Sequence, residues 1–583
     1  MTFEQFIELA IAVGKTDKEN AILTVDTETN AKDIRDGRGY CIGISMAVKV
    51  DEAYFGIYIP IKHKTEIEGL ATAEQLAKLK AVIEHWPGYL VFHNAKFDLE
   101  SLRTAGINYT GKFYCTMIMC HLINENFPFA KDLTSCVKHY VSKDESKKDD
   151  PAFTYLTEYY GWDGVPIPIM YEYAVHDAYI TAKLFFAILD KFKAEVPDEY
   201  WEHKQRFTRV VIAMEPRGVN LDQGMSREMA RIGEEMMEDI MVELNGFNPG
   251  SPKDLHYLLI EKLGMPVIKR SKKTQKPSFD KEAMEEYDRM LEGENDPTAK
   301  LVFAYRGYQK TTSSNYKAYL ELVSPDGRLR PNYKLHGTKT GRMSCEKPNL
   351  QQIPRQSDKP WNGNLKQAFI PAPGYVLYEF DYSQLELRLG TAYAKEESLL
   401  DVFADPDRDI FTEMSKTLEM TRQDTKTFVY STQYGAGLDR LSHVFRVSRD
   451  KADDMRRGYY NAYPGFVKVS RRASQLCKMS GKVQLWTKRY RHFWDRKEDA
   501  HKAFNSVIQG GAADIVEHVM VRLYNEIDCD DVRMLLQVHD SVVFEIREDL
   551  VEVYVPKIKA LMEDVQPNFG VTFKVEASRW GSK

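Results

Sequence analysis

Two acidic residues in the second half of the chain stand where a strand is expected to end. Asp381 follows the apolar run 376–378 and precedes a turn-like Tyr-Ser pair. Asp540 lies between two groups of strand-forming residues within 535–544, as at the turn of a hairpin. If these strands pair with the strand before Asp381, the two carboxylates meet and can hold metal ions. On its own, Asp381 could equally cap a helix that begins near Leu385.

A regular stripe of cationic and aromatic residues lies between these two acids. Arg422, Lys426, Tyr430 and Tyr434 recur every four residues. At about 100° per residue each step drifts by about 40°, so the set stays on one face of a helix. A stripe that is cationic at its N-terminal end and aromatic at its C-terminal end suits a triphosphate that continues into a base. Taken alone, the pattern is better explained by an ordinary amphipathic helix with two core tyrosines.

Three acidic residues in the first 100 positions also follow predicted strands. Asp26 and Glu28 come after the strand 22–25, and side chains two residues apart in an extended chain face the same way. Adjacent anions repel each other unless a positive charge lies between them. Asp98 follows the strand 89–92. Each pattern alone is common on protein surfaces.

A tyrosine and a fourth acid complete this group. Tyr173 and Asp177 are four residues apart in a helical stretch and share a face. In this order, the four acids and the tyrosine resemble the three motifs of the 3'-5' exonuclease superfamily, over about residues 22–184. The resemblance implies that Tyr173 helps to position the attacking water. It also implies four carboxylates that hold two divalent ions, namely Asp26, Glu28, Asp98 and Asp177.

Six spaced motifs extend over the rest of the chain. They occupy residues 340–344, 348–354, 381–386, 422–435, 509–514 and 538–540. In this order they resemble family A DNA polymerases, those like bacterial DNA polymerase I, from about Glu215 to Gly581. So many motifs in one order leave little room for coincidence.

The resemblance to family A implies specific roles for the metal and nucleotide ligands. The carboxylates of Asp381 and Asp540 and the backbone carbonyl of Tyr382 would hold two Mg²⁺ ions, for which Mn²⁺ could substitute. Arg422 and Lys426 would neutralise the phosphates of the incoming nucleotide. The complete set expected to bind the dNTP is Tyr382, Ser383, Gln384, Glu386, Arg422, Lys426 and Tyr430.

The resemblance also assigns the sugar and base contacts, with three departures from the family pattern. Tyr430 is expected beside the incoming sugar, Tyr434 at the base-pair site, and Glu386 against the 2' position, where it excludes ribonucleotides. The family often has Phe at the place of Tyr430, and the extra hydroxyl predicts ready acceptance of dideoxynucleotides. Phe411 and Ser541 stand where the family usually has His and Glu. Neither change removes a principal metal ligand.

Residues expected to contact DNA fall into two groups. The first matches family positions at the minor groove or primer terminus, where all base pairs share acceptors, and consists of Arg342, Asn505, Gln509 and His539. The second is Lys272 and Lys273 in the basic stretch 269–276, which has a counterpart at 488–492. Such stretches are usually solvated loops, and a net charge of −6 argues against a nucleic-acid partner. Two of them nevertheless favour a basic cleft.

The family resemblances imply an α/β and α+β multidomain chain, with a ribonuclease H-like exonuclease domain followed by a right-hand polymerase. A chain of 583 residues is too long for a single core. The expected exonuclease domain is 1–195 and the expected polymerase domain is 196–583. Within the latter we expect a thumb at about 222–322, fingers at about 401–480, and a palm at about 323–400 and 481–583.

Cysteine usage and hydropathy narrow the class of protein. Seven scattered cysteines without a C-x-x-C pair predict neither a disulfide framework nor a zinc site. The N-terminal residues include acids where a targeting segment would carry bases, and no run reaches the roughly 18 apolar residues that a membrane span needs. We therefore expect a cytoplasmic protein without a membrane partner, in the host cytoplasm if a phage encodes it.

Together, these features predict a DNA-directed DNA polymerase, a nucleotidyltransferase, with 3'-5' exodeoxyribonuclease proofreading. It would act as a monomer on primer-template DNA and dNTPs. The exonuclease motifs begin within thirty residues of Met1, which favours a replicative enzyme of phage type over a bacterial repair enzyme. A helicase, a single-strand binding protein or a processivity factor could be replisome partners. The alternatives are an exonuclease whose polymerase-like half only grips DNA, and an inactive replisome scaffold.

Overall fold

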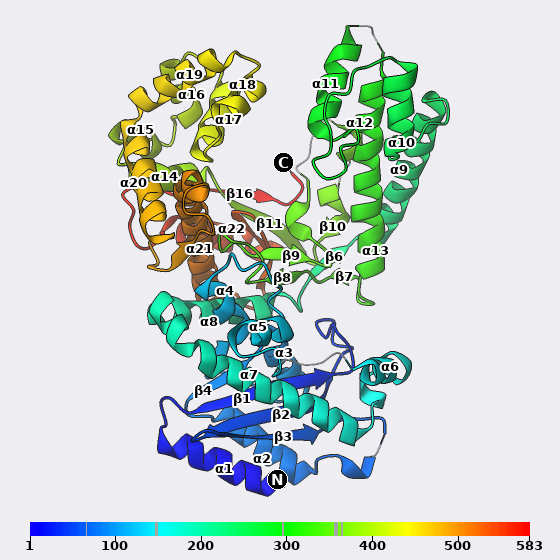
Figure 1. Ribbon diagram of the computed structural model, residues 1–583, viewed down its shortest axis with the longest axis vertical. Coiled ribbons are helices and arrows are strands. Elements are labelled where there is room, and N and C mark those ends of the chain that lie inside the picture. The colour runs from blue at the N-terminus through cyan, green and yellow to red at the C-terminus, as the bar shows by residue number, and fades with distance from the viewer. Residues whose placement is uncertain (66, 146–149, 294–295, 355–358, 363–364, 583) are drawn as a thin grey trace.

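Helices and strands alternate through a chain that folds into two unequal parts (Figure 1). The computed structural model describes residues 1–582, except 66, 146–149, 294–295, 355–358 and 363–364. A sheet covered by helices forms one end of the molecule, and a larger unit with several sheets and two helical groups forms the other. The predicted mixed α/β, multidomain fold class is confirmed.

The first part is built on one five-stranded sheet. Its strands in spatial order are β3 (Ala53–Pro60), β2 (Cys41–Val50), β1 (Ile22–Thr29), β4 (Tyr89–Phe92) and β5 (Lys112–Cys115). β1 runs parallel to β4 and antiparallel to β2. The successive residues Leu23, Thr24 and Val25 are all inaccessible to solvent. Because neighbouring side chains of a strand point to opposite faces, both faces of this sheet are covered.

Eight helices surround this sheet or lead away from it. They are α1 (Phe3–Thr16), α2 (Ala73–Glu84), α3 (Ala95–Thr104), α4 (Thr116–Ile123), α5 (Leu133–Tyr140), α6 (Pro151–Tyr160), α7 (Ile167–Glu195) and α8 (Asp198–Met214). The predicted helix 73–84 coincides with α2, which begins at a capping box formed by Thr72 and Gln75. The strand predicted over 22–25 is too short. β1 continues to Thr29 because its second half also pairs with β2.

The second part begins with a group of long helices, coloured green in Figure 1. They are α9 (Gln223–Glu243), α10 (Pro252–Leu255), the π-helix η3 (His256–Lys262), α11 (Lys281–Glu292), α12 (Thr298–Gln309), the π-helix η4 (Lys310–Lys317) and α13 (Ala318–Leu322). The prediction of a mainly helical tract over residues 201–322 is therefore confirmed. A small sheet lies at its base and contains β10 (Phe369–Ile370), β6 (Val219–Leu221) and β7 (Arg328–Leu329).

A four-stranded antiparallel sheet lies between the two helical groups of the second part. Its strands in order are β14 (Val532–Val538), β15 (Ser541–Arg547), β11 (Tyr375–Tyr382) and β16 (Val575–Arg579). Phe380 and Phe544 are fully buried on one face and meet edge to face, with centroids 5.9 Å apart. A separate hairpin is formed by β8 (Asn332–Lys334) and β9 (Ser344–Glu346).

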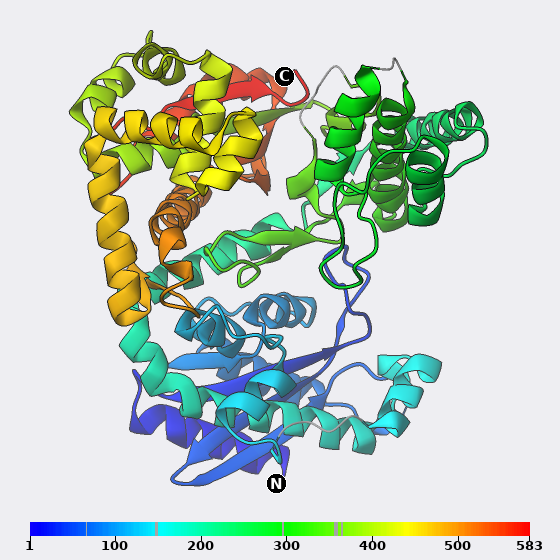
Figure 2. The ribbon, with the colours of Figure 1, turned by 45° about the horizontal axis from the view of Figure 1, so that its top comes forward.

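The remaining helices form the second helical group or pack beside the four-stranded sheet. The group itself contains α15 (Glu397–Ala404), α16 (Ile410–Leu418), α17 (Arg422–Gln433), α18 (Leu438–Phe445), α19 (Arg449–Ala462) and α20 (Pro464–Ser480). Near the sheet lie α14 (Leu385–Ala394), α21 (Ala503–Glu526) and α22 (Val551–Glu563). Figure 2 shows α20 running from this group along one side of the molecule toward the first part, where β12 (Lys482–Gln484) pairs with β13 (Tyr490–His492).

The basic stretch 488–492 does not form part of a free basic cleft, contrary to expectation. Arg489 pairs with Asp514 at 3.0 Å, and Arg491 pairs with Glu125 at 2.7 Å. Both arginines are buried. The partners of both arginines are distant in the sequence, so the sequence around 488–492 does not indicate that these charges are paired. The Arg491 pair fastens the second part to the first.

All seven cysteines are free thiols. Across the residues that the structure describes, no helix combines the length and the apolar character needed to cross a membrane.

Helix α8 joins the two parts through a buried ion pair. Lys204 Nζ lies 2.7 and 2.8 Å from the two carboxylate oxygens of Glu517 on α21. The side chains of Lys204 and Glu517 are only 2% and 5% exposed. A pair buried so deeply leaves an uncompensated charge if one partner is lost.

We expect Lys204→Met to lower the free energy of unfolding by about 3–5 kcal/mol, because Glu517 would remain buried without its partner. Chemical denaturation measures the change. Arg206→Met on the same helix is the control, since its 3.6 Å contact with Glu202 is exposed and should contribute at most about 1 kcal/mol. If both variants lost the same free energy of unfolding, burial of the Lys204–Glu517 pair would not be the cause.

Candidate active sites

The turn between β14 and β15 brings Asp540 beside the end of β11. Asp381 pairs in register with Ser541, the first residue of β15. The Tyr382 N–H donates to the carbonyl oxygen of Asp540 at 3.4 Å. His539 and Asp540 form a two-residue turn, in which His539 has the positive φ of 55° that tight hairpins favour. The predicted pairing of these strands is confirmed, and it places Asp540 next in sequence to the residue that faces Asp381.

A third acid lies opposite Asp381 on the other neighbouring strand. Glu576 of β16 pairs in register with Asp381, and its carboxylate accepts a hydrogen bond from Ser383 Oγ at 3.0 Å. Directly opposed residues in antiparallel strands share a face, with Cβ atoms about 4.5–5.5 Å apart. Sequence reasoning missed Glu576 because no motif surrounds it. The apolar and polar alternation of 575–579 could have indicated a strand, but not its register.

Glu386 is buried in the first turn of α14 and is held from two sides. Tyr434 Oη donates to its Oε2 at 2.8 Å, and Arg342 Nη2 contacts its Oε1. The same nitrogen of Arg342 lies 3.2 Å from Asp540 Oδ1. Burial raises the pKa of Glu386, although Arg342 and Tyr434 act in the opposite direction. Tyr434, Glu386, Arg342 and Asp540 thus form one connected polar chain.

Arg422 opens helix α17 and is anchored to a neighbouring helix. Its Nε and Nη2 donate to the two carboxylate oxygens of Asp409 at 2.8 and 2.9 Å. Asp409 also caps α16 by accepting the Thr412 N–H at 2.8 Å. The hydrogen bond from Arg422 is the main cause that lowers the pKa of Asp409 to about 2. A guanidinium held in this fork keeps a fixed orientation and has further N–H donors to offer.

The residues of the stripe on α17 share one side of the helix, as predicted. The buried ring of Phe411 lies 6.0 Å from Arg422 Cζ, 5.9 Å from Lys426 Nζ and 5.8 Å from the Tyr430 ring. The Tyr430 and Tyr434 rings are 6.0 Å apart. Tyr434 is the C-cap of the helix and is 42% exposed. It is therefore not a core residue, as it would be in an ordinary amphipathic helix with two core tyrosines.

The other residues predicted to contact DNA lie on three different elements. Asn505 and Gln509 are half-buried on α21, four residues apart and therefore on one face. His539 is exposed at the turn beside Asp540. Lys272 and Lys273 are exposed in the loop between η3 and α11, within the green helical group. Contact with DNA stays a prediction for all five.

Three of the four predicted exonuclease acids converge in the first part. Asp26 and Glu28 of β1 and Asp177 of α7 each offer a carboxylate oxygen, and these oxygens all lie within 4.8 Å of one another. Tyr173, one turn before Asp177, stacks on Phe153 of α6 with centroids 3.9 Å apart. Burial raises the pKa of the Tyr173 phenol, and the three nearby carboxylates raise it further.

Asp98, the fourth predicted acid, is turned toward the backbone of β1. Its Oδ1 accepts hydrogen bonds from the Thr27 N–H at 3.1 Å and from the Thr27 hydroxyl at 2.9 Å, and the residue is 2% exposed. Burial raises the pKa of Asp98 to about 8, against the lowering effect of Thr27. Asp98 therefore adjoins the group of three without belonging to it, and its role as a metal ligand stays a prediction.

The donor atoms at both sites fit a hard divalent cation. Carboxylate oxygens come from Asp26, Glu28 and Asp177 in the first part, and Asp381 and Asp540 are the predicted ligands in the second. Oxygen-only donor sets suit Mg²⁺ or Mn²⁺ and not Zn²⁺. Three carboxylates within 4.8 Å of one another repel each other unless a cation or protons compensate them.

Comparison with known families places the larger part of the chain. Residues 219–582, more than half of the sequence, match DNA polymerase family A. The chain belongs to DNA polymerase family A. Residues 2–193 match the 3'-5' exonuclease family.

Several known DNA polymerases are similar to this chain in sequence or in fold. DNA polymerase I of Pseudomonas aeruginosa is 28% identical over 582 residues, which cover 94% of this chain and 61% of that protein. The thermostable DNA polymerase I of Thermus aquaticus is 30% identical over 400 residues, 65% of this chain and 47% of that protein. The solved POL domain of Pol1 from M. smegmatis, in complex with DNA primer-template and dNTP, shares the fold: the TM-score is 0.80 at 21% identity, over 99% of this chain and 98% of that one.

Two of the three departures from the usual family A pattern, Phe411 and Ser541, have local structural roles. Phe411 is 1% exposed and packs against Tyr430 of α17. A histidine would place polar nitrogens at this buried position. The Ser541 Oγ lies 2.9 Å from Val538 O and 3.1 Å from Glu379 Oε1, and its single proton can be donated to either acceptor. The contact with Val538 closes the hairpin that carries Asp540, and the Glu379 carboxylate lies beside the Ser541 hydroxyl.

We expect Asp177→Asn to weaken Mn²⁺ binding at the exonuclease cluster, because one of three converging carboxylates is lost. The loss should exceed the roughly 10–100-fold cost of removing an outer-shell partner of a metal ligand. Titration followed by calorimetry, with Mn²⁺ alone, measures the affinity. Glu172→Gln, an exposed acid on the same helix, is the control. Unchanged affinity in Asp177→Asn would mean that the cluster does not hold the ion.

Proposed function

We propose that this chain is a template-directed DNA polymerase that adds dNTPs to a primer 3'-OH, and that it is also a 3'-5' exonuclease. The observation that carries the proposal is the convergence of Asp381 and Asp540 at two strand ends, joined through Arg342 and Glu386 to the cationic and aromatic helix α17. A separate carboxylate cluster lies in the first part. Because the M. smegmatis relative was solved with DNA primer-template and dNTP, we infer the same ligand classes here.

We further propose the division of the chain that the family implies. Residues 1–195 would form the exonuclease domain and 196–583 the polymerase domain. The green helical group of Figure 1 would be the thumb (about 222–322), the yellow group the fingers (about 401–480), and the four-stranded sheet with its neighbours the palm (323–400 and 481–583). A duplex would lie over the sheet between the two helical groups.

In the polymerase reaction, the residues of this chain would position the primer end and the triphosphate. Asp381, Asp540 and the Tyr382 carbonyl would hold two Mg²⁺ ions, which when bound supply positive charge at the reacting phosphate and lower the pKa of the attacking hydroxyl. Arg422 and Lys426 would bind the phosphates and neutralise the charge that builds up on the leaving group. Arg422 would have to share its guanidinium between Asp409 and the phosphates.

Nucleotide selection would depend on the connected chain at Glu386. The Tyr434 hydroxyl and Arg342 hold the Glu386 carboxylate in place, so a 2'-hydroxyl would meet a side chain that cannot easily turn away. Tyr430, which packs between Phe411 and Tyr434, would present its phenol to the sugar. Asn505, Gln509 and His539 would contact the primer terminus or minor groove, where correct geometry can be checked without reading sequence.

In the exonuclease reaction, Asp26, Glu28 and Asp177, with Asp98 beside them, would hold the divalent ions. The phenol of Tyr173 would orient the attacking water. Stacking on Phe153 keeps its ring in place, and the raised pKa keeps the hydroxyl protonated as a hydrogen-bond donor at neutral pH.

The two rival functions need an inactive polymerase half. Both an exonuclease that merely grips DNA and a replisome scaffold would allow the metal-binding acids to be lost. Asp381 and Asp540 are retained, and the surrounding polar contacts hold them in one place. This observation favours an active polymerase. Mg²⁺ as the natural ion and partners in a replisome remain part of the proposal.

Separate substitutions should abolish the two activities independently. Asp381→Ala should reduce primer extension by about a thousandfold or more, since removal of a metal ligand forfeits several kcal/mol of transition-state stabilisation, and should spare primer degradation. Asp26→Ala should do the reverse. A labelled primer-template, with and without dNTPs, reports both reactions. Loss of both activities in either variant would refute two independent sites.

We expect Tyr430→Phe to discriminate more strongly against dideoxynucleotides. The lost hydroxyl can replace the hydrogen bonding of a missing 3'-OH, and one such bond corresponds to a change of about tenfold. Competition between a dideoxynucleotide and its deoxynucleotide in single-nucleotide extension measures the ratio. Asp424→Asn is the control, because Asp424 is exposed on the same helix and lies about 120° around it from Tyr430. An unchanged ratio in Tyr430→Phe would exclude this role.

A further inference from the structure

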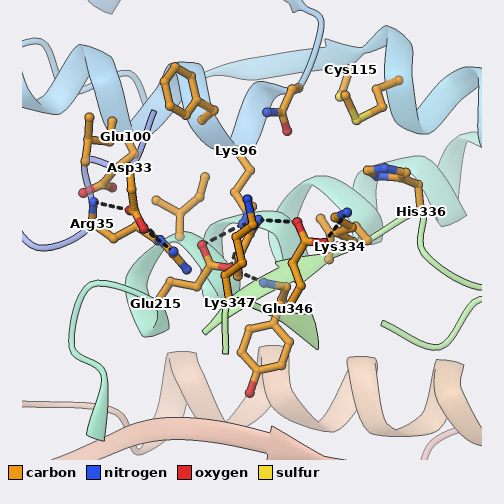
Figure 3. A pocket seen from close by; sticks show the side chains of 18 of the residues that line it. Asp33, Arg35, Lys96, Glu100, Cys115, Glu215, Lys334, His336, Glu346 and Lys347 are labelled. Atoms are coloured by element: carbon orange, nitrogen blue, oxygen red, sulfur yellow. Dashed lines mark hydrogen bonds and ion pairs between the residues drawn. The ribbon is translucent and has the colours of Figure 1, made fainter. Parts of the chain in front are cut away.

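A cavity of about 410 Å³ lies where the first part of the molecule meets the second (Figure 3). Its wall on the first side includes Lys96 of α3, and its opposite wall includes Glu215 at the end of α8 and Asn332 at the start of β8. The lining carries both signs of charge, and Figure 3 shows Lys96 and Lys334 directed at Glu215 and Glu346. The contacts across this cavity, more than its volume, are its distinctive feature.

Lys96 makes a complete set of contacts across the boundary. Its Nζ lies 2.6 and 2.7 Å from the two carboxylate oxygens of Glu215 and 2.7 Å from Asn332 Oδ1. An ammonium has three donors, and all three are used. The Lys96 and Glu215 side chains are only 14% and 4% exposed. A buried pair of this kind has one favourable arrangement, so it fixes how the two surfaces meet.

On the first side, the contact is joined directly to the exonuclease acids. Lys96 is in the first turn of α3, and Asp98 follows two residues later in the same turn. Asp98 is bonded to both the N–H and the hydroxyl of Thr27. Thr27 stands between Asp26 and Glu28 on β1. One helical turn therefore connects the ion pair to the carboxylate cluster.

On the second side, the contact is joined to the polymerase acids. Glu215 Oε1 accepts the N–H of Tyr333 at 2.6 Å. Tyr333 is fully buried, and its hydroxyl donates to Gln537 O at 3.1 Å and accepts the Gln537 N–H at 3.0 Å. Gln537 belongs to β14 and precedes Asp540 by three residues. A rigid strand end thus connects the ion pair to the turn that carries Asp540.

We propose that Lys96 and Glu215 are positioning residues, which hold the exonuclease acids at a fixed place relative to the polymerase acids so that one primer end can be used at both sites. The inference rests on the proposed function. A primer end on a template is restrained by the duplex and can reach the exonuclease cluster only if that cluster has a fixed place. A free single strand has no such restraint. Displacements of about 1 Å are enough to reduce productive positioning substantially.

Other ion pairs also cross this boundary, but they do not make these connections. Lys204 with Glu517 and Arg491 with Glu125 lie on α8, α21, β13 and the segment after α4. None of these elements carries one of the six acids proposed to hold metal. Loss of such a pair would weaken the joint but leave the contacts of Lys96 and Glu215 in place.

The test compares two substrates for the same full-length protein with Mg²⁺. One is a free single-stranded oligonucleotide, and the other is a primer-template with a mismatched primer 3' end. In Lys96→Met we expect degradation of the single strand within about twofold of the unsubstituted protein, and removal of the mismatched nucleotide slower by about tenfold or more. Lys32→Met, in the same cavity wall but exposed, is the control and should change neither rate.

A second variant covers the case in which Lys96→Met fails to fold because Glu215 is left buried and unpaired. The double variant Lys96→Met with Glu215→Gln removes both charges and keeps an acceptor for the Tyr333 N–H. It should show the same selective loss as Lys96→Met, with no further decrease, since the same contact is removed in both variants.

The outcomes separate this inference from the proposed function. If Lys96→Met and the double variant lost both reactions equally, or kept the ratio of the two rates, Lys96 and Glu215 would not position the sites relative to each other. If the unsubstituted protein neither extended the primer nor degraded the single strand, the proposed function would be wrong.

Discussion

The pairing register of β11 is the constraint on which the polymerase site depends. Asp381 faces Ser541 on one side and Glu576 on the other, and a shift by one residue would turn Asp381 toward the buried face that Phe380 and Phe544 occupy. That buried face makes such a shift costly, because Phe380 and Tyr382 would both lose their buried positions. The aromatic core under the sheet therefore holds the acids above it in place.

Once the register is set, the main physical problem is the density of negative charge. Asp381, Asp540, Glu576 and Glu386 belong to one small region. Arg342 compensates part of this charge by contacting both Glu386 and Asp540. What remains suits divalent cations, and the charge of the proposed triphosphate would be met by Arg422 and Lys426. The exonuclease cluster has the same character on a smaller scale.

The two clusters are connected by buried polar contacts, although they belong to different sheets. Helix α8 carries Lys204 in its middle and is followed by Glu215, so a single element reaches α21, α3 and β8. Buried ion pairs contribute little net stability but strongly favour one arrangement over others. The basic stretch 488–492 also contributes buried ion pairs. Its arginines pair with Asp514 and Glu125 and do not extend a DNA-binding surface.

The sequence by itself determined the features that depend on local order. The motif spacing identified the family, the acids that follow apolar runs, and the stripe on α17. The helical spacing of residues 73–84 predicted α2 with the bounds that the structure shows. Tertiary structure alone decided which distant residues meet. It turned Asp98 toward Thr27, added Glu576 beside Asp381, and neutralised Arg489 and Arg491. The physical reason is that strand register and buried ion pairing join residues far apart in the chain, and no local pattern of residue types encodes the partner.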